Sequence, residues 1–372
     1  MKKGGLLLLV ILFLTYGYQG YKTIRIYMNN EVKIKTSGLL SDISDNVIPV
    51  PLETPDNRDV RLIKRVQRDG NDIFLLSESG LLHFDISGKF INQPAIEISS
   101  NDDVFIADYT LDTDYNRIIV IDSQRNISKY DYSGNLISKA KIKHQWRRLT
   151  AFAYHNGYLW ATAESMEKFT DDNYQIIHRL YQLDSDMNEI SNQNLYSVDV
   201  GRDITYNSLC IDELLVDEDG LYAYSSPTDM KHLLSDTLHI LQYKGIPLMA
   251  HTNNHYGEAG VYPVRKSKRH IISTNNNSID NCYTFCFDKT NNNAYLLPEG
   301  FKDNFYNTGY ITNLQPMDIY NTSYCYIKTN TDFSEKTYGK ILEKASEKRN
   351  KKTYEKVMNN DNPVLFIVTL KA

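Results

Sequence analysis

The sequence is poor in the groups that most often reveal a function. It has two tryptophans and four cysteines in 372 residues, and no nucleophile elbow, phosphate loop, dinucleotide fingerprint or H-E-x-x-H motif. We therefore predict no cofactor and no metal, and nothing supports an enzyme. The formal net charge of −5 argues against a nucleic-acid partner, because phosphate binding needs a basic excess. With 41% hydrophobic and 23% charged residues, the composition is that of a globular protein.

The longest apolar run is short and lies at the N-terminus. Leu6–Leu14 follows two lysines, which is the pattern of a secretory signal, and is well below the roughly 20 residues of a membrane-spanning helix. The first cysteine is Cys210, so a lipoprotein anchor is excluded. Gly17 and Gly20 offer cleavage positions without an A-x-A site, and retention as an uncleaved membrane anchor stays open. The chain is predicted to be extracytoplasmic, in the periplasm or anchored in the inner membrane and facing it.

The four cysteines do not form a disulfide or zinc framework. Cys282 and Cys286 lie in a strand-like segment. A strand rises about 3.3 Å per residue, so their Cα atoms would lie roughly 13 Å apart, beyond the ~7 Å limit for a disulfide. We expect buried, reduced thiols. A bridge between blades that involves Cys325 is the alternative.

A unit of short strands and tight turns recurs along the chain. Its clearest copies carry Asp85 and Gly88 in the first unit and Asp131 and Gly134 in the second. The two aspartates are 46 residues apart, and so are the two glycines. The Asp-x-Ser-Gly sequence supplies the side-chain hydrogen bonds and the positive φ of a tight turn. Fainter copies bring the number of units to six. Such repeats, each with several strands, are typical of an all-β, six-bladed β-propeller.

The ends of the chain supply the remaining parts of a propeller. Val47–Glu53 is predicted to pair with Val364–Leu370, which closes the ring and leaves no open sheet edge. Near the C-terminus, Ser334 is a plausible N-cap, and apolar residues follow at helical spacing. The predicted organisation is a signal peptide or membrane anchor at 1–22, a linker at 23–46, and a propeller at 47–372 with a helical insertion at 332–359.

Several short motifs occur in an order that resembles the bacterial TolB-like six-bladed β-propeller family. They are Ile48–Glu53, the turn Phe84–Ile91, Gly300–Asp303 and Asn362–Leu365. The resemblance spans Val47 to Lys371 and implies an exported propeller, in a family largely without assigned function. The chain departs from the family where Asn92–Ser100 replaces a glycine-rich loop and where Asp303-Asn304 replaces an acidic pair.

The geometry of a propeller suggests where a ligand would bind. Loops that lead into the innermost strands crowd one face, at the mouth of the axial channel. Trp146 offers a stacking platform there, and the neighbouring arginines offer bidentate donors for sugars or carboxylates. The alternative is salt-bridged packing between blades. The candidate ligand-binding residues are Asp103, Trp146, Arg147, Arg148 and Arg202.

Two functions remain open. The first is a monomeric, exported, non-enzymatic binding or scaffolding propeller that engages a peptide, protein or glycan through one face. The second is a saccharide-directed hydrolase or lyase with its active site in the axial channel. A convergent pocket with two carboxylates would favour the enzyme, and a shallow aromatic face would favour binding.

Overall fold

The structure is a computed structural model of the whole chain. It describes residues 33–53, 60, 63–94, 105–143, 146–170, 173–201, 211–217, 220–226, 237–240, 246–247, 264–266, 269–276, 282–291, 293–320, 323–329, 333–347, 351–358 and 362–371. The predicted signal or anchor at 1–22 lies outside these residues. In the described part of the chain, no helix is both long enough and apolar enough to cross a membrane.

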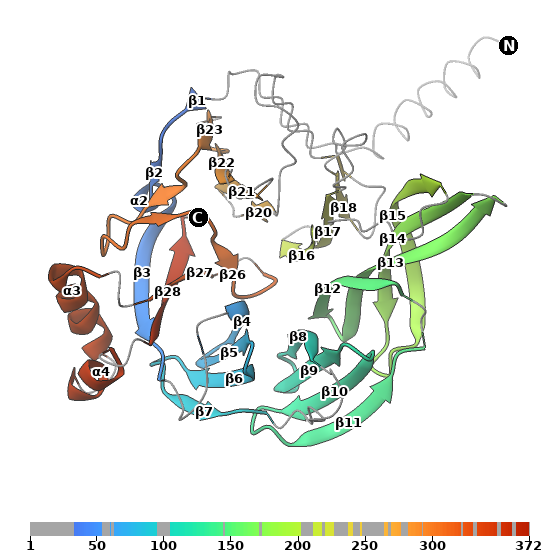
Figure 1. The fold of residues 1–372 in the computed structure, drawn as a ribbon, viewed down its shortest axis with the longest axis horizontal. Helices are drawn as coiled ribbons and strands as arrows, with labels where there is room; N and C mark the ends of the chain where they lie inside the picture. The colour runs from blue at the N-terminus through green and yellow to red at the C-terminus, as the bar shows by residue number, and fades with distance from the viewer. Residues whose placement is uncertain are drawn as a thin grey trace, which may run out of the picture.

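Six antiparallel blades are arranged in a ring, which confirms the predicted fold class (Figure 1). Blade 1 holds β4 (Ile63–Asp69), β5 (Asp72–Ser77), β6 (Gly80–Asp85) and β7 (Phe90–Asn92). Blade 2 holds β8 (Ile106–Asp112), β9 (Arg117–Asp122), β10 (Asn126–Asp131) and β11 (Leu136–Lys141). Blade 3 holds β12 (Arg148–His155), β13 (Tyr158–Thr170), β14 (Asn173–Leu183) and β15 (Glu189–Gly201).

The other three blades follow the same order from the centre outward. Blade 4 holds β16 (Ile211–Asp217), β17 (Gly220–Ser226), β18 (Thr237–Ile240) and β19 (Ile246–Pro247). Blade 5 holds β20 (Val264–Lys266), β21 (His270–Asn276), β22 (Cys282–Asp288) and β23 (Asn293–Leu297). Blade 6 holds β26 (Gln315–Pro316), β27 (Tyr324–Thr329), β28 (Pro363–Leu370) and β3 (Ser44–Pro51).

The repeated turn has the geometry that its sequence predicts. In blade 1 the Asp85 carboxylate accepts a hydrogen bond from the Ser87 amide at 2.8 Å, and Gly88 has a φ of +80°. Blade 2 repeats this turn with Gly134, at a φ of +88°. In blade 3 the equivalent position is Met187, which adopts a φ of +67° and buries its side chain. The same turn conformation therefore forms in blade 3 without a glycine.

The ring is closed by the N-terminal strand, as predicted. β3 pairs antiparallel with β28, with Val50 opposite Leu365 and Val47 opposite Val368. Val47, Val50 and the adjacent Leu52 are buried. The outermost strand of the last blade thus comes from the beginning of the chain, and the two ends of the ring are held together by backbone hydrogen bonds.

The predicted linker at 23–46 is wrong for residues 33–46, which are built into the propeller. β1 (Lys33–Ile34) pairs in parallel with β23, and β2 (Gly38–Leu39) pairs with β24 (Phe301–Lys302) in a small sheet with β25 (Tyr310–Ile311). The short helix α2 (Leu40–Ile43) buries both of its end residues. The segment reads as polar because strand pairing at a sheet edge uses the backbone, not apolar side chains.

Two helices lie outside the last blade, within the range predicted for an insertion. α3 (Glu335–Ser346) and α4 (Lys351–Met358) connect β27 to β28 and cover the outer side of β3 (Figure 1). The hydroxyl of Ser334 accepts the Thr337 amide at 3.2 Å, as expected of an N-cap. Ile341 and Tyr354 pack into the core of blade 6.

The cysteines whose side chains the structure describes are reduced. Cys286 and Cys325 are buried free thiols. Burial raises the pKa of the Cys286 thiol to about 12, so the reactive thiolate is scarce at neutral pH. Cys210 and the side chain of Cys282 lie outside the described part of the structure, although β22 confirms the predicted strand from Cys282 onward.

Candidate functional site

The innermost strands surround a cavity on the ring axis. The strands β4, β8, β12, β16, β20 and β26 face the centre of the ring in Figure 1. Between them lies a cavity of about 280 Å³. Its lining comes from β4, β8, β12, β16 and the segment 313–319, so five of the six blades contribute. Residues far apart in sequence converge there.

One ion pair spans the cavity wall between the first two blades. Nη1 of Arg65 on β4 lies 2.5 and 2.6 Å from the two carboxylate oxygens of Asp108 on β8. Nη2 of the same guanidinium donates to the carbonyl of Phe152 on β12 at 3.2 Å. Both charged side chains are partly exposed to the cavity, at 28% and 19%. Arg65 therefore holds three blades together and presents a fixed polar surface to the channel.

Gln67 is a cavity residue with a buried polar group that is unused among the described residues. It is 6% exposed, and its Oε1 atom has no hydrogen-bond partner among the described residues. A buried acceptor without a partner costs about 1–3 kcal/mol. Such an atom in a cavity wall points to a ligand or solvent donor.

A short segment crosses the far end of the channel. We call residues 317–320, which follow β26, the strap. The carbonyl of Met317 accepts the Arg68 amide of blade 1 at 2.8 Å, and that of Ile319 accepts the Val216 amide of blade 4 at 2.5 Å. Arg68 and Val216 lie near the ends of β4 and β16. The cavity residues Arg65 and Asp108, in contrast, lie near the beginnings of their strands.

The strap also reaches blade 3. The ring of Tyr320 lies 5.9 Å from that of His155, the last residue of β12. Ile319 packs against the apolar cluster shared by blades 3 and 4. The strap thus contacts blades 1, 3 and 4 where their inner strands end, and the cavity lies on the other side of it.

Two of the five sequence-predicted site residues lie outside the described part of the chain, namely Asp103 and Arg202. Trp146 is 3% exposed, and its ring packs 5.2 Å from that of Tyr181 inside blade 3. It borders a polar hollow on blade 3 and does not belong to the axial cavity. Its aromatic surface is used for packing and is not presented as a platform.

The two arginines after Trp146 are engaged within blade 3. The guanidinium of Arg148 lies 2.6 Å from the carboxylate of Glu164, which stands opposite it on β13. Glu164 is buried, and Nε2 of the buried His178 lies 3.5 Å from the same carboxylate. Arg147 is half-buried, and its amide donates to the carbonyl of Glu164 at 2.7 Å. These contacts join strands within blade 3. They are not the salt bridges between blades that the alternative to a ligand site predicts.

No sequence pattern described above points to the residues that line the cavity. Arg65, Gln67 and Asp108 lie within inner strands. In the sequence they look like the ordinary polar positions of a strand in which polar and apolar residues alternate. A usable signal does exist, because Arg65 and Asp108 are 43 residues apart, close to the 46-residue repeat. Polar residues that recur at equivalent positions of inner strands indicate a wall of the axial channel.

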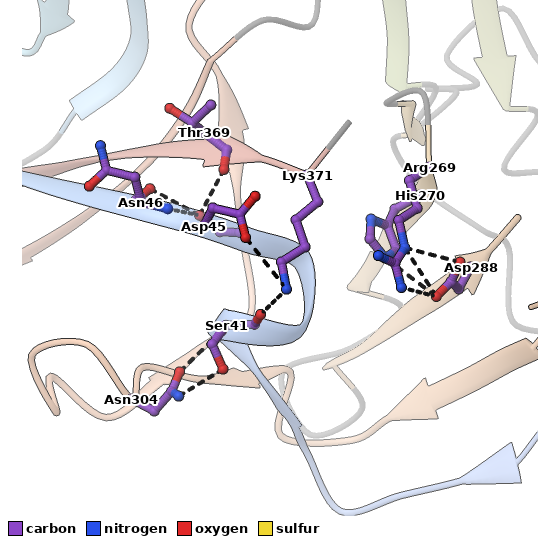
Figure 2. Close-up of polar contacts among 10 residues, drawn as sticks. Ser41, Asp45, Asn46, Arg269, His270, Asp288, Asn304, Thr369 and Lys371 are labelled. Atoms are coloured by element: carbon purple, nitrogen blue, oxygen red, sulfur yellow. Dashed lines mark hydrogen bonds and ion pairs between the residues drawn. The ribbon is translucent and has the colours of Figure 1, made fainter. Parts of the chain in front are cut away.

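A second cavity, of about 340 Å³, lies where residues 35–43 meet blade 5 and the C-terminus. Figure 2 shows Lys371 donating to the carbonyl of Ser41, at 2.7 Å. It also shows Arg269 beside Asp288, with guanidinium and carboxylate 2.9 Å apart. Burial raises the pKa of Asp288, but the hydrogen bonds from Arg269 and the Thr290 amide, together with the charges of Arg269 and His270, outweigh it and hold the pKa below its usual value. The charged groups of this cavity mainly fasten parts of the propeller to one another.

The Asp303-Asn304 pair also has a structural role. The buried carboxylate of Asp303 accepts the amides of Phe305 and Tyr306 at 2.9 and 3.1 Å, and the hydroxyl of Thr308 at 2.7 Å. Asn304 exchanges hydrogen bonds with Ser41 (Figure 2). Asp303 stabilises its own loop, and Asn304 ties that loop to the N-terminal segment.

Two solved structures and one sequence family are similar to this chain. The chain is similar to a Bacteroides fragilis protein inferred to be exported, with a TM-score of 0.58 and 15% identity over 91% of this chain and 100% of that one. A weaker similarity, with a TM-score of 0.38 and 9% identity, covers 68% of this chain and 89% of the β-propeller domain of Cps50 (Swd1) from Myceliophteria thermophila. No curated protein matches the chain. A sequence family described as a 6-bladed beta-propeller matches residues 22–208, half of the chain, and the chain belongs to that family.

Proposed function

We propose that this protein is an exported, non-enzymatic binding propeller that holds part of a peptide, protein or glycan in its axial cavity. The ligand approaches from the face where the inner strands begin. Export is supported by the N-terminal apolar run and by the similarity to a protein inferred to be exported. Membership of the TolB-like group is part of the same proposal, and the motifs in Ile48–Glu53 and Phe84–Ile91 support it.

The observation that carries the proposal is the lining of the axial cavity. Gln67 keeps a buried acceptor without a partner, and the guanidinium of Arg65 is held rigidly by Asp108. Polar groups that are fixed in place and converge from several blades are typical of a preformed ligand site. The site is a concave, polar pocket and not the shallow aromatic face expected of a simple binding surface, so the choice between binding and catalysis depends on its two carboxylates.

The competing function is a saccharide-directed hydrolase or lyase. It gains some support because two carboxylates, those of Asp108 and Asp318, line the cavity. Both are already hydrogen-bonded within the protein. Asp108 accepts from Arg65 through both oxygens, and Asp318 accepts the amide and hydroxyl of Ser323 at 3.2 and 3.0 Å. Groups held in this way serve the structure, so binding is the better-supported function.

A thermal-shift screen of the mature chain against peptides and oligosaccharides tests the proposal. Asn313→Trp fills the cavity, because Asn313 is exposed and lines it. We expect this variant to lose the ligand-induced rise in Tm. Ser138→Trp, on the exposed strand β11, is the matched control and should keep it. Retention of the shift in both variants would place the ligand elsewhere.

The same samples separate binding from catalysis. A bound saccharide should be recovered unchanged after prolonged incubation, as judged by mass spectrometry. Cleavage products that disappear in Asp318→Asn would instead establish the hydrolase or lyase.

A further inference from the structure

The axial cavity carries enough detail to name the chemistry of its ligand. We propose that it binds one neutral sugar unit, either a free monosaccharide or the end of a glycan chain. This inference rests on the proposed function and narrows it. It depends on which polar groups of the cavity are free, and on the strap that crosses one end of the channel.

The cations of the cavity are either paired or exposed to solvent. The guanidinium of Arg65 is neutralised by Asp108, and the carboxylate of Asp318 is held by Ser323. Lys64 is the remaining cation of the lining, and it is exposed to solvent. An anionic ligand would have to give up its hydration without gaining an unpaired buried cation, which is costly. The lining therefore disfavours an anionic ligand, and the amides among its free groups match a neutral ligand.

The free groups of the cavity are amides. Gln67 offers a buried acceptor, and the side chains of Asn313 and Gln315 make no hydrogen bond within the described part of the chain. Each primary amide has a donor and an acceptor side by side. Neighbouring hydroxyls of a sugar present the same pair, since each hydroxyl both donates and accepts. The acceptor of Gln67 needs a donor, and a sugar hydroxyl supplies one once the covered Oε1 atom turns toward the cavity.

The paired carboxylate adds to this match. Asp108 accepts two hydrogen bonds from Arg65 and one from the Tyr109 amide, and a carboxylate can accept about four. It can therefore accept one further hydroxyl while it remains paired. Pro316, Ile319 and Ala151 supply apolar surface in the same lining, suited to the C–H face of a sugar ring.

Size and closure limit the ligand to one unit. The cavity of about 280 Å³ lies just below the ~300–1,000 Å³ range of sites that take drug-sized molecules. The strap lies across the end of the channel, where Met317 and Ile319 accept backbone hydrogen bonds from blades 1 and 4. A chain that enters from the opposite face must stop at the strap. An internal stretch of a glycan cannot thread through.

The experiment measures binding of neutral monosaccharides by saturation-transfer NMR and calorimetry. The panel contains hexoses, N-acetylhexosamines, pentoses and a deoxyhexose, with charged amino acids and dipeptides as the contrasting set. Gln67→Leu removes the amide at nearly constant size. Gln193→Leu on β15 is the matched control, because its side chain makes no hydrogen bond in the described structure and lies on the outer strand of blade 3.

We expect at least one neutral sugar to bind, and Gln67→Leu to weaken it at least tenfold while Gln193→Leu leaves it unchanged. The Tm of Gln67→Leu should equal or exceed that of the natural chain, because the substitution removes an unpaired buried acceptor. A loss of binding can then not be attributed to unfolding. On an array of linear neutral oligosaccharides, the hit sugar should bind only at a chain end; binding of the free sugar alone identifies a monosaccharide site.

The failures are distinguishable. If no neutral sugar binds, or if charged amino acids or dipeptides bind in a Gln67-dependent manner, the sugar assignment is wrong and the axial site itself survives. Equal binding of internal and terminal sugars overturns the role of the strap. A ligand whose affinity is unchanged by both Gln67→Leu and Asn313→Trp overturns the proposed function as well.

Discussion

At the scale of single residues, the repeated turn shows how one backbone conformation is met under different constraints. Gly88, Gly134 and Met187 all adopt positive φ after an aspartate. Met187 pays the conformational cost of a side chain there, and its burial in the core of blade 3 offsets it. Gly88 has no such choice, since a Cβ atom would lie 2.1 Å from the carbonyl oxygen of Pro51. The turn of blade 1 lies directly against the closing strand.

This difference predicts that Gly88→Ala is much more destabilising than Gly70→Ala. Gly70 also has a positive φ, +54°, but a Cβ there would meet nothing within 4 Å. We expect backbone strain of about 1–2 kcal/mol at Gly70 and a total of about 2–5 kcal/mol at Gly88, where the clash is added. Urea unfolding of both variants measures the difference. Equal losses would show that the turn moves away from Pro51 without cost.

At the scale of elements, the closing strand has more effect on the fold than its length suggests. β3 covers the outer edge of β28 and lies between β28 and the helices α3 and α4. It buries Val47 and Val50, and Leu52 follows directly. Burial of three such side chains is worth about 5–9 kcal/mol, which is comparable to the ~5–15 kcal/mol that stabilises a whole domain.

Removal of this strand should therefore open the ring. A chain that begins at residue 33 should be monomeric and fold cooperatively. A chain that begins at residue 54 should aggregate, because the apolar strand β28 becomes an exposed sheet edge. Light scattering and circular dichroism distinguish the two. A synthetic peptide of residues 44–53 should reduce aggregation of the shorter chain. A monomeric shorter chain with an unchanged Tm would show that β3 is dispensable.

At the scale of the whole molecule, the sequence predicts the ring better than the site. Blades are specified locally, by turns such as Asp85 to Gly88 and by the helix cap at Ser334, so they can be read from short segments. The cavity is specified by the juxtaposition of Arg65 and Asp108, and their contact exists only once the blades are in place. Trp146 shows the reverse, because an aromatic residue beside arginines resembles a binding loop until its packing against Tyr181 is known.

The completed ring also has a second point of attachment, where residues 33–43, blade 5 and Lys371 meet. His270 is 2% exposed there and faces Asp288, Arg269, Lys371 and Lys289. Burial lowers the pKa of His270. The charge of Asp288 raises this pKa, but the neighbouring cations offset part of that rise. The neutral ring is thus favoured in the folded protein. The unfolded chain, with a histidine pKa of about 6.5, takes up its proton first as the pH falls.

We therefore expect the Tm to fall as the pH is lowered through about 6.5, and to continue falling until the lower pKa of folded His270 is reached. A further loss should follow below about pH 4, where the carboxylate of Asp288, with its lowered pKa, is protonated in the unfolded chain first. His270→Gln should flatten the first part of the profile and leave most of the second, because His270 makes the smallest of the named contributions to the lowered pKa of Asp288. His155→Gln is the matched comparison, since burial lowers the pKa of His155 too, but at the strap. Differential scanning fluorimetry between pH 3 and 8 measures all three profiles. If His270→Gln keeps the full slope near pH 6, the attachment beside blade 5 does not set the acid stability of the ring.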